Sequence, residues 1–344
     1  MKREHKFLLY LSLFSVLVVS VVMATAIGAV AVPPGETFRV IFSRLTGLFD
    51  SSDIPRTTTA IIWNLRLPRV LLAALIGASL ASAGVTFQGL LRNPLADPFT
   101  IGVSSGAATG ATLAMLLRQL YQLNFPQMIP LFAFVGAFLA MFFVYNLARI
   151  GGQVPVVTLL LAGVVVSSFL SAVISLLMVL SGESMQGIFF WLSGGLMMRS
   201  WTEIWFVLPY LLLGFAILYA YARDLNVLLM GEEAALSLGV NVEVTKKILL
   251  VVASLVTAAA VSVSGMIGFV GLIIPHAVRI VTGSDHRILL PSSALVGASF
   301  LVWADVVART AMAPKEIPVG IITAFVGAPF FIYLLRKKKS EIRL

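Results

Sequence analysis

Long apolar runs alternate with short polar breaks along almost the whole chain. Each run approaches the roughly 20 residues that an α-helix needs to cross the hydrocarbon core of a bilayer. A segment within lipid must satisfy its backbone hydrogen bonds internally, which favours helices over isolated strands. The pattern therefore predicts an all-α polytopic membrane protein with about ten transmembrane helices. The predicted spans are residues 7–32, 67–91, 99–117, 128–148, 155–180, 204–222, 245–263, 266–281, 288–308 and 317–335.

The first apolar run follows a basic head, MKREHK, which is also typical of a secretory signal peptide. The apolar core of a signal peptide has about 7–15 residues, whereas this run extends from Phe7 to Val32. We therefore interpret it as a retained first span. The loop that follows, Pro33 to Trp63, is the longest that the pattern predicts, and we expect it on the outer side.

Composition agrees with a membrane protein, since 59% of the residues are hydrophobic and only 11% are charged. The net charge of +9 could suggest nucleic-acid binding, but the cations flank apolar runs instead of forming a basic soluble face. We therefore expect a lipid bilayer as partner and no nucleic acid. The chain has no cysteine, which excludes disulfides and thiolate metal sites.

Basic residues also predict the orientation. An even number of spans puts both termini on one side, and a cytoplasmic placement leaves 15 of the 24 lysines and arginines inside and nine outside. Cytoplasmic loops carry such an excess, so both termini are predicted to be cytoplasmic. No linker or extramembrane domain interrupts the pattern, and residues 1–344 are predicted to form a single transmembrane domain.

Catalytic and metal-binding motifs are missing from the sequence. There is no G-x-x-x-x-G-K-[ST] phosphate loop and no H-E-x-x-H zinc motif, and the three histidines, at positions 5, 276 and 286, are scattered. We predict no catalytic residue, no metal site and no bound cofactor. The spans also hold few ionisable residues, which argues against an ion-coupled carrier and places the energy source in another chain.

Arginines mark the outer ends of two spans. In NLRLPRV (64–70), Arg66 and Arg69 lie three apart where the second span begins. They could anchor the helix at lipid headgroups, or present guanidinium groups to the carboxylates of an outer partner. Near another outer end, Asp305 and Arg309 have the i,i+4 spacing of a helical ion pair.

Polar positions near membrane depth cluster after the second span. In GVTFQGLLRNPLADPFTIGVSSGA (84–107), Gln88 and Asn93 accompany a broken backbone. Such a break is tolerated only where protein or a water-filled cavity covers it. A structural turn and a polar pathway are both compatible with this pattern. The small residues of ALIGASLASAG (74–84) favour close helix packing.

A short polar helix is predicted within LLMGEEAALSLGVN (228–241). Glu232 and Glu233 suit a helix N-terminus, and Gly239 suits the position just past its end. About seven residues cannot span a membrane and are marginal as a helix alone. A helix lying on lipid would favour lysines over a glutamate pair. We therefore expect it in a cytoplasmic loop, in contact with a protein partner.

Taken together, four segments resemble the FecCD-type permeases of type II ABC importers, which take up iron-siderophores, cobalamin or haem. The segments are residues 64–107, LLMGEEAALSLGV, GFVGLIIPHAVRIV and EIPVGIITAFVGAPFFIYLL, in the family's order between about residues 65 and 335. The resemblance implies a type II ABC importer permease fold and a non-catalytic subunit of the bacterial cell (inner) membrane. Its implied partners are a second permease subunit, preferably in a homodimer, an extracytoplasmic binding protein, and two cytoplasmic ABC ATPase subunits that use ATP and Mg.

The resemblance also implies roles for particular residues. Family abundance favours a ferric siderophore as cargo, with cobalamin or haem as the alternatives. The implied binding-protein docking residues are Arg66, Arg69 and Arg309. The implied ATPase-coupling helix, at about 231–240, includes Glu232, Glu233, Ala234, Ser237, Leu238 and Gly239. For the translocation pathway, the resemblance adds Ser167 and Ser168 to the polar candidates Gln88 and Asn93.

Overall fold

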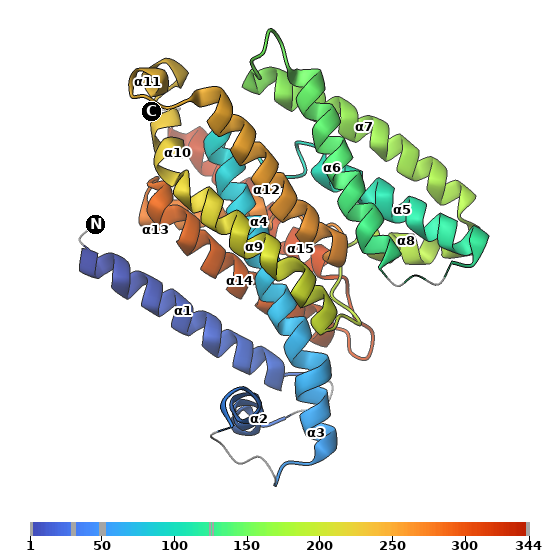
Figure 1. The fold of residues 1–344 in the computed structure, drawn as a ribbon. Helices are drawn as coiled ribbons and strands as arrows, with labels where there is room; N and C mark the ends of the chain where they lie inside the picture. Colours follow the sequence, from blue (N-terminus) through green and yellow to red (C-terminus); the bar gives the residue numbers. More distant parts are fainter. Residues whose placement is uncertain (1–2, 29–31, 48–52, 124, 126, 342–344) are drawn as a thin grey trace.

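The computed structural model describes residues 3–28, 32–47, 53–123, 125 and 127–341, and these are almost entirely helical (Figure 1). Within them the only β-type pairing is an isolated bridge between Ile150 and Gln153. The helices are α1 (Arg3–Ala26), α2 (Pro34–Thr46), α3 (Arg56–Ala60), α4 (Leu67–Leu90), α5 (Val103–Tyr121), α6 (Met128–Ala148), α7 (Val156–Leu180), α8 (Met185–Leu192), α9 (Trp201–Ala220), α10 (Ala222–Leu228), α11 (Glu232–Ser237), α12 (Val242–Ser264), α13 (Val270–Thr282), α14 (His286–Thr310) and α15 (Val319–Glu341).

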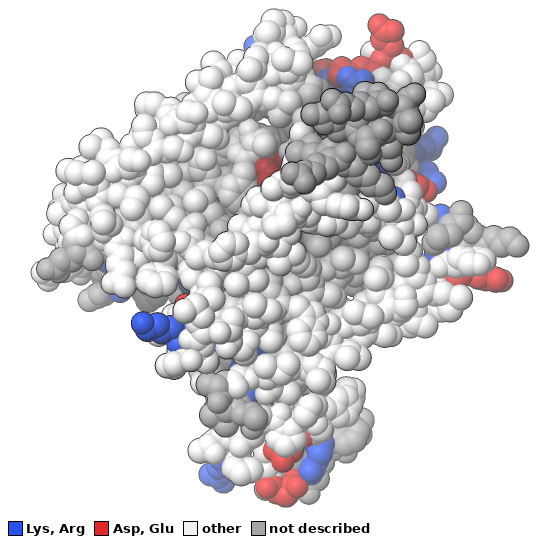
Figure 2. All heavy atoms as spheres, turned by 180° about the vertical axis from the view of Figure 1, so that it is seen from behind, with Lys and Arg blue, Asp and Glu red and all other residues white. Residues whose placement is uncertain are grey.

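Every predicted span coincides with a helix, which confirms the all-α polytopic fold. Seven helical segments of the described chain are long and apolar enough to cross a membrane, α13 and α15 contribute shorter apolar stretches, and α5 is a helix of 19 residues. Charged side chains gather mainly toward the two ends of the face seen in Figure 2, with a broad uncharged band between them. Such an uncharged band is expected of a protein that crosses a hydrocarbon core about 30 Å thick.

Side-chain contacts show that α1 and α14 run in the same direction, which agrees with the predicted alternation of the spans. The Tyr10 hydroxyl donates to the Arg287 carbonyl at 3.2 Å, and the Trp303 indole donates to the Ser20 hydroxyl at 3.0 Å. Sequence numbers thus increase together along α1 and α14, which correspond to the first and ninth predicted spans. Parallel first and ninth spans are required if each successive span reverses direction.

The structure differs from the prediction in two respects around the outer end. The first span ends at Ala26 and not at residue 32. Residues 29–31 of the predicted span lie outside the described part of the chain. The predicted outer loop at 33–63 contains α2 and α3, and a π-helical turn (Ile61–Arg66) joins α3 to α4. Val40 and Ile62 are fully buried in a small apolar cluster there, so packing stabilises helices that lack a membrane-length apolar run.

Glycines allow α4 to pack at the centre of one helix group, with α9, α12, α13 and α14 around it (Figure 1). A Cβ atom on Gly77 would overlap the Gly297 carbonyl of α14, and one on Gly84 would overlap the Gly271 carbonyl of α13. These backbone approaches confirm the predicted close packing of residues 74–84. A second group, α5 to α8, lies beside the first (Figure 1).

Candidate functional site

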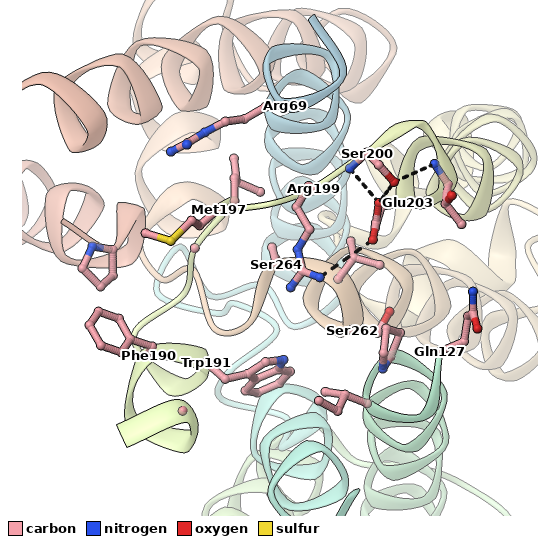
Figure 3. A pocket seen from close by; sticks show the side chains of 18 of the residues that line it. Arg69, Gln127, Phe190, Trp191, Met197, Arg199, Ser200, Glu203, Ser262 and Ser264 are labelled. Carbon is pink, nitrogen blue, oxygen red and sulfur yellow. Dashed lines mark hydrogen bonds and ion pairs between the residues drawn. The ribbon is translucent and has the colours of Figure 1, made fainter. Parts of the chain in front are cut away.

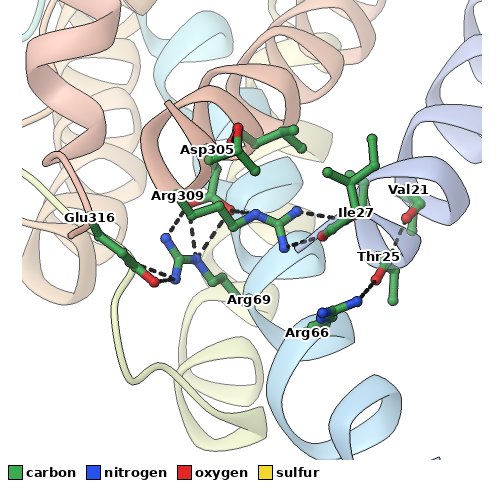
Figure 4. A network of polar contacts seen from close by, with 11 residues as sticks. Val21, Thr25, Ile27, Arg66, Arg69, Asp305, Arg309 and Glu316 are labelled. Carbon is green, nitrogen blue, oxygen red and sulfur yellow. Dashed lines mark hydrogen bonds and ion pairs between the residues drawn. The ribbon is translucent and has the colours of Figure 1, made fainter. Parts of the chain in front are cut away.

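Arg69 joins two other segments at the outer end of the molecule. Its guanidinium donates to Asp305 of α14 at 2.8 to 3.1 Å and to Glu316, in the turn before α15, at 2.9 and 3.1 Å (Figure 4). Arg309 lies one turn beyond Asp305, and its Nε is 3.4 Å from the Asp305 carboxylate. The i,i+4 pair predicted from the sequence is therefore confirmed, and Glu316 is a partner that the sequence did not reveal.

Arg66 and Arg309 bind the end of α1. Arg66 donates to the Ala26 carbonyl at 2.9 Å, while Arg309 donates to the carbonyls of Ala24 and Ile27 (Figure 4). The last carbonyls of a helix have no partner within the helix and carry partial negative charge. The two cations satisfy these carbonyls, so the predicted arginines hold the first span against α4 and α14.

All three predicted docking arginines thus meet in one network, and all three are largely buried. Arg66 is 8% exposed, Arg309 is 9% exposed, and the Arg69 side chain is 12% exposed. Three arginines against two carboxylates give this network an excess of one positive charge. The geometry establishes a structural function for them, while docking of an outer protein stays a prediction.

The predicted short cytoplasmic helix is α11, and Figure 1 shows it projecting at the end opposite α2 and α3. Gly239 has φ +82°, a left-handed conformation that favours glycine, and its N–H donates to the Leu236 carbonyl at 3.0 Å. The N–H of Val240 then donates to the Ala235 carbonyl at 3.0 Å. The helix end was therefore correctly predicted, and α11 has six residues.

A buried lysine ties α11 to the next span. Lys246 of α12 is only 5% exposed, and its ammonium group lies 2.7 Å from Glu232 and 3.4 Å from Glu243. Arg92, just after α4, is 3.9 Å from the other Glu232 oxygen. Because a buried ammonium without these carboxylates would cost several kcal/mol, α11 and α12 are electrostatically coupled. The sequence analysis did not predict that Lys246 holds α11 to α12, although the i,i+3 spacing of Glu243 and Lys246 could have indicated an ion pair.

Several side chains of the α11 region face outward. Glu233, Ser237 and Gly239 are exposed, Ala234 is half-buried, and Ala235 is the buried residue that anchors the helix. Large apolar side chains are also exposed here, with Met230 at 71%, Leu236 at 60% and Leu238 at 62%. An exposed apolar group on a short helix outside the spans is typical of a protein-binding surface.

The four pathway candidates do not converge in the described chain. Gln88 is buried and donates to the carbonyls of Gly271 and Leu272 in α13 at 3.2 and 3.1 Å. Asn93 accepts a hydrogen bond from the Leu95 N–H at 2.9 Å, which is the structural turn considered above. Their proposed roles in the pathway stay predictions.

Ser167 and Ser168 occupy different surfaces of α7. The Ser167 hydroxyl is buried beside Gly102, whereas Ser168 is exposed. Ser171 and Ser175 are also exposed on α7, and its other exposed side chains are apolar, including Val165 at 61% and Phe169 at 67% exposure. Such a surface needs lipid or another protein to cover it.

Fold and site define a multi-pass membrane protein with an exposed short helix that is held to one of its spans. The family model described as the FecCD transport family matches residues 16–337. The cobalamin import system permease of Halobacterium salinarum is 53% identical, covering 83% of this chain and 76% of that protein. The hemin transport system permease of Yersinia pestis is 40% identical, covering 81% and 84%.

A solved structure is also similar over most of its length. It is an inward-facing ABC transporter described as of the metal-chelate type, with a TM-score of 0.83 and 33% identity over 95% of this chain and 98% of that chain. The chain belongs to the FecCD transport family. It is a multi-pass permease-family protein of the cell membrane, as its sequence motifs predicted.

Proposed function

We propose that the chain is the membrane-spanning permease subunit of an ATP-driven importer of bulky metal chelates. In this proposal it is non-catalytic and binds no cofactor. It pairs with a second permease subunit, most simply another copy, while two cytoplasmic ATPases use ATP and Mg, and an extracytoplasmic binding protein delivers the cargo. The observation that carries the proposal is α11, an exposed apolar-tipped helix tied by Lys246 to a membrane span.

The coupling follows from this geometry. Closure of a bound ATPase pair would displace α11, and the contact between Glu232 and Lys246 would pass the displacement to α12. An effector shifts a two-state equilibrium only through contacts that differ between the states. The exposed Met230, Leu236 and Leu238 would supply such contacts with the ATPase.

Among cargoes, cobalamin becomes the first to test. Family abundance alone favoured a ferric siderophore, but identity to the cobalamin permease is 53% against 40% for the hemin permease. A ferric chelate and haem follow. The mostly apolar exposed face of α7 offers few polar groups that would retain any of these cargoes.

The test is uptake of labelled cobalamin, a ferric siderophore and haem into vesicles that hold this chain with its ATPase and binding protein. We expect ATP-dependent accumulation of one ligand, lost when Leu236 and Leu238 are both replaced by aspartate. The Leu45→Asp variant, on the exposed outer side of α2, is the matched control and should transport normally. Uptake driven by an ion gradient without the ATPase would contradict the proposal.

A further inference from the structure

A cavity of about 840 Å³ lies at the outer end, within this one chain and apart from the exposed face of α7 (Figure 3). Its walls come from α8, α9, the segment between them, the turn between α5 and α6, and the ends of α12 and α15. We call it the outer cavity. Its size is within the range of small-molecule sites, which are concave, mainly apolar and furnished with a few polar groups.

The walls of the outer cavity are held by backbone contacts. The Gly195 N–H donates to the Ser264 carbonyl of α12 at 2.7 Å, and the Gly320 N–H donates to the Gly194 carbonyl at 3.2 Å. Gly194 has φ +69°, and a side chain there would also overlap the Met266 carbonyl. The segment between α8 and α9 is therefore fixed on two helices, so the cavity is preformed.

One buried donor in this cavity has no acceptor. Trp191 of α8 is 8% exposed, and its indole N–H meets no hydrogen-bond partner among the described residues. Figure 3 shows the indole nitrogen on the cavity side, facing the region of the Arg199 guanidinium. Leaving a buried donor unsatisfied costs about 1–3 kcal/mol, so an acceptor from a ligand would be stabilised here.

A second donor group is only weakly neutralised. The Arg199 Nε is buried without a hydrogen bond, and the shortest approach of its guanidinium to Glu203 is 3.9 Å. The other Glu203 oxygen instead accepts from the N–H and hydroxyl of Ser200 at 2.9 and 2.8 Å, capping α9. Arg199 therefore keeps donors for an anion, and guanidinium groups bind carboxylates and phosphates strongly.

We propose that the outer cavity binds an amphipathic anion, whose oxygens accept hydrogen bonds from Trp191 and Arg199 while its apolar body fills the remaining space. Phe190, Met197 and Leu131 line the cavity and are 44 to 49% exposed, which provides an apolar route into it. An acidic phospholipid of the outer leaflet has this chemistry. An imported cargo with phosphate or carboxylate oxygens on an apolar body also has this chemistry. Cargo as the occupant rests on the proposed function.

The test uses the purified full-length chain and two probes, phosphatidylglycerol and phosphatidylcholine with identical brominated chains. Bromine quenches nearby indoles, and subtracting the Trp191→Phe signal isolates the quenching of Trp191 from that of the other four tryptophans. We expect the acidic lipid to quench Trp191 at a concentration about tenfold lower than the neutral one. Arg199→Gln should abolish this preference, whereas Arg44→Gln, an exposed arginine of α2, should preserve it.

Equal quenching by both lipids, or a preference that survives in Arg199→Gln, would overturn the proposal. Native mass spectrometry gives a readout that does not need the Trp191 variant, since wild type should retain one more phosphatidylglycerol than Arg199→Gln. Displacement of that lipid by cobalamin or haem would identify cargo as the occupant, and its retention would identify lipid. Because the ATPase is absent from these measurements, a failure of the transport proposal would leave their result unchanged.

Discussion

At the residue scale, the outer arginines stabilise the packing of the helices, although the sequence suggests that they bind an outer protein. Arg66 and Arg309 donate to carbonyls at the end of α1, and Asp305 lies between Arg69 and Arg309. The Asp305 side chain is 1% exposed, so removing either cation would leave a buried carboxylate with one partner fewer. A docking role can be separated from this one only by measuring stability together with binding.

We predict that Arg66→Gln and Arg309→Gln each lower the free energy of unfolding by about 1–3 kcal/mol, because the charged donors to the α1 carbonyls are lost. Thermal unfolding of the purified chain in detergent measures this effect. Arg44→Gln, which removes an exposed arginine from α2, is the control and should unfold like wild type. Loss of binding-protein docking with unchanged unfolding would assign the arginines to recognition instead.

A second residue-scale prediction concerns Asp97, in the segment between α4 and α5. Burial raises the pKa of its carboxyl group from 3.8 to about 6, although the N–H groups of Thr100 and Phe99 favour the charged form. The folded state thus binds this proton more tightly than the unfolded state. Its stabilising contribution is complete below pH 3.8 and is lost as the pH rises through about 6.

Wild type should therefore lose thermal stability between pH 4 and pH 7 relative to Asp97→Asn, which cannot titrate. Unfolding temperatures of both proteins at several pH values measure the difference. Glu4→Gln, at an exposed position of α1, should follow the wild-type curve. Parallel curves for wild type and Asp97→Asn would show that the carboxyl is not perturbed.

At the element scale, α11 is stabilised by contacts beyond its own six residues. Such a short helix is unstable alone, and Lys246 together with the buried Ala235 holds it on the molecule. Gly239 ends it in a conformation that other residues adopt at a cost of about 1 kcal/mol. In the proposed importer, a displacement of α11 by its partner would reach α12 through the Glu232–Lys246 contact.

We expect Lys246→Met to increase amide hydrogen exchange throughout α11, because the bond to Glu232 is lost. Glu232→Gln should have a similar effect, and the double variant should be little worse than Lys246→Met alone, since both changes break one interaction. Glu233→Gln changes an exposed carboxylate of the same helix and should leave exchange unaltered. If the effects of Lys246→Met and Glu232→Gln on hydrogen exchange are fully additive in the double variant, the two side chains do not interact directly.

At the scale of the whole molecule, the two helix groups have different surroundings. Helix α4 is enclosed by other helices, whereas only Leu159, Ala162, Gly163 and Ile174 of α7 are buried. Transfer of the exposed α7 surface out of water is favourable, so it is covered by lipid or by a second subunit. The proposed importer assigns it to the second subunit.

The absence of native cysteine makes this assignment directly testable. In membranes that contain the chain, Val165→Cys on α7 should form a disulfide with a second copy on mild oxidation. Phe14→Cys on α1 has comparable exposure, 56% against 61%, and should remain monomeric if lipid covers α1. Equal cross-linking of both variants would indicate random collision, and none at Val165 or its α7 neighbours would exclude a homodimer through this face.

The sequence by itself determined the span count, the alternation of directions and the short helix that ends at Gly239. These features depend on local quantities: the length of an apolar run, backbone hydrogen bonding within lipid, and the conformational freedom of glycine. It also predicted the Asp305–Arg309 pair, because four residues are about one helical turn. The family motifs predicted the transport family for the same reason, since they are contiguous in the chain.

Only the tertiary structure decided which distant groups meet. Arg66 and Arg309 both reach the end of α1, Lys246 is buried against α11, and Trp191 and Arg199 border one cavity. Helix α2 likewise forms because its Val40 and Ile41 pack against other segments. A buried ion pair or an unsatisfied donor depends on neighbours far along the chain, and no local pattern of residue types encodes that proximity.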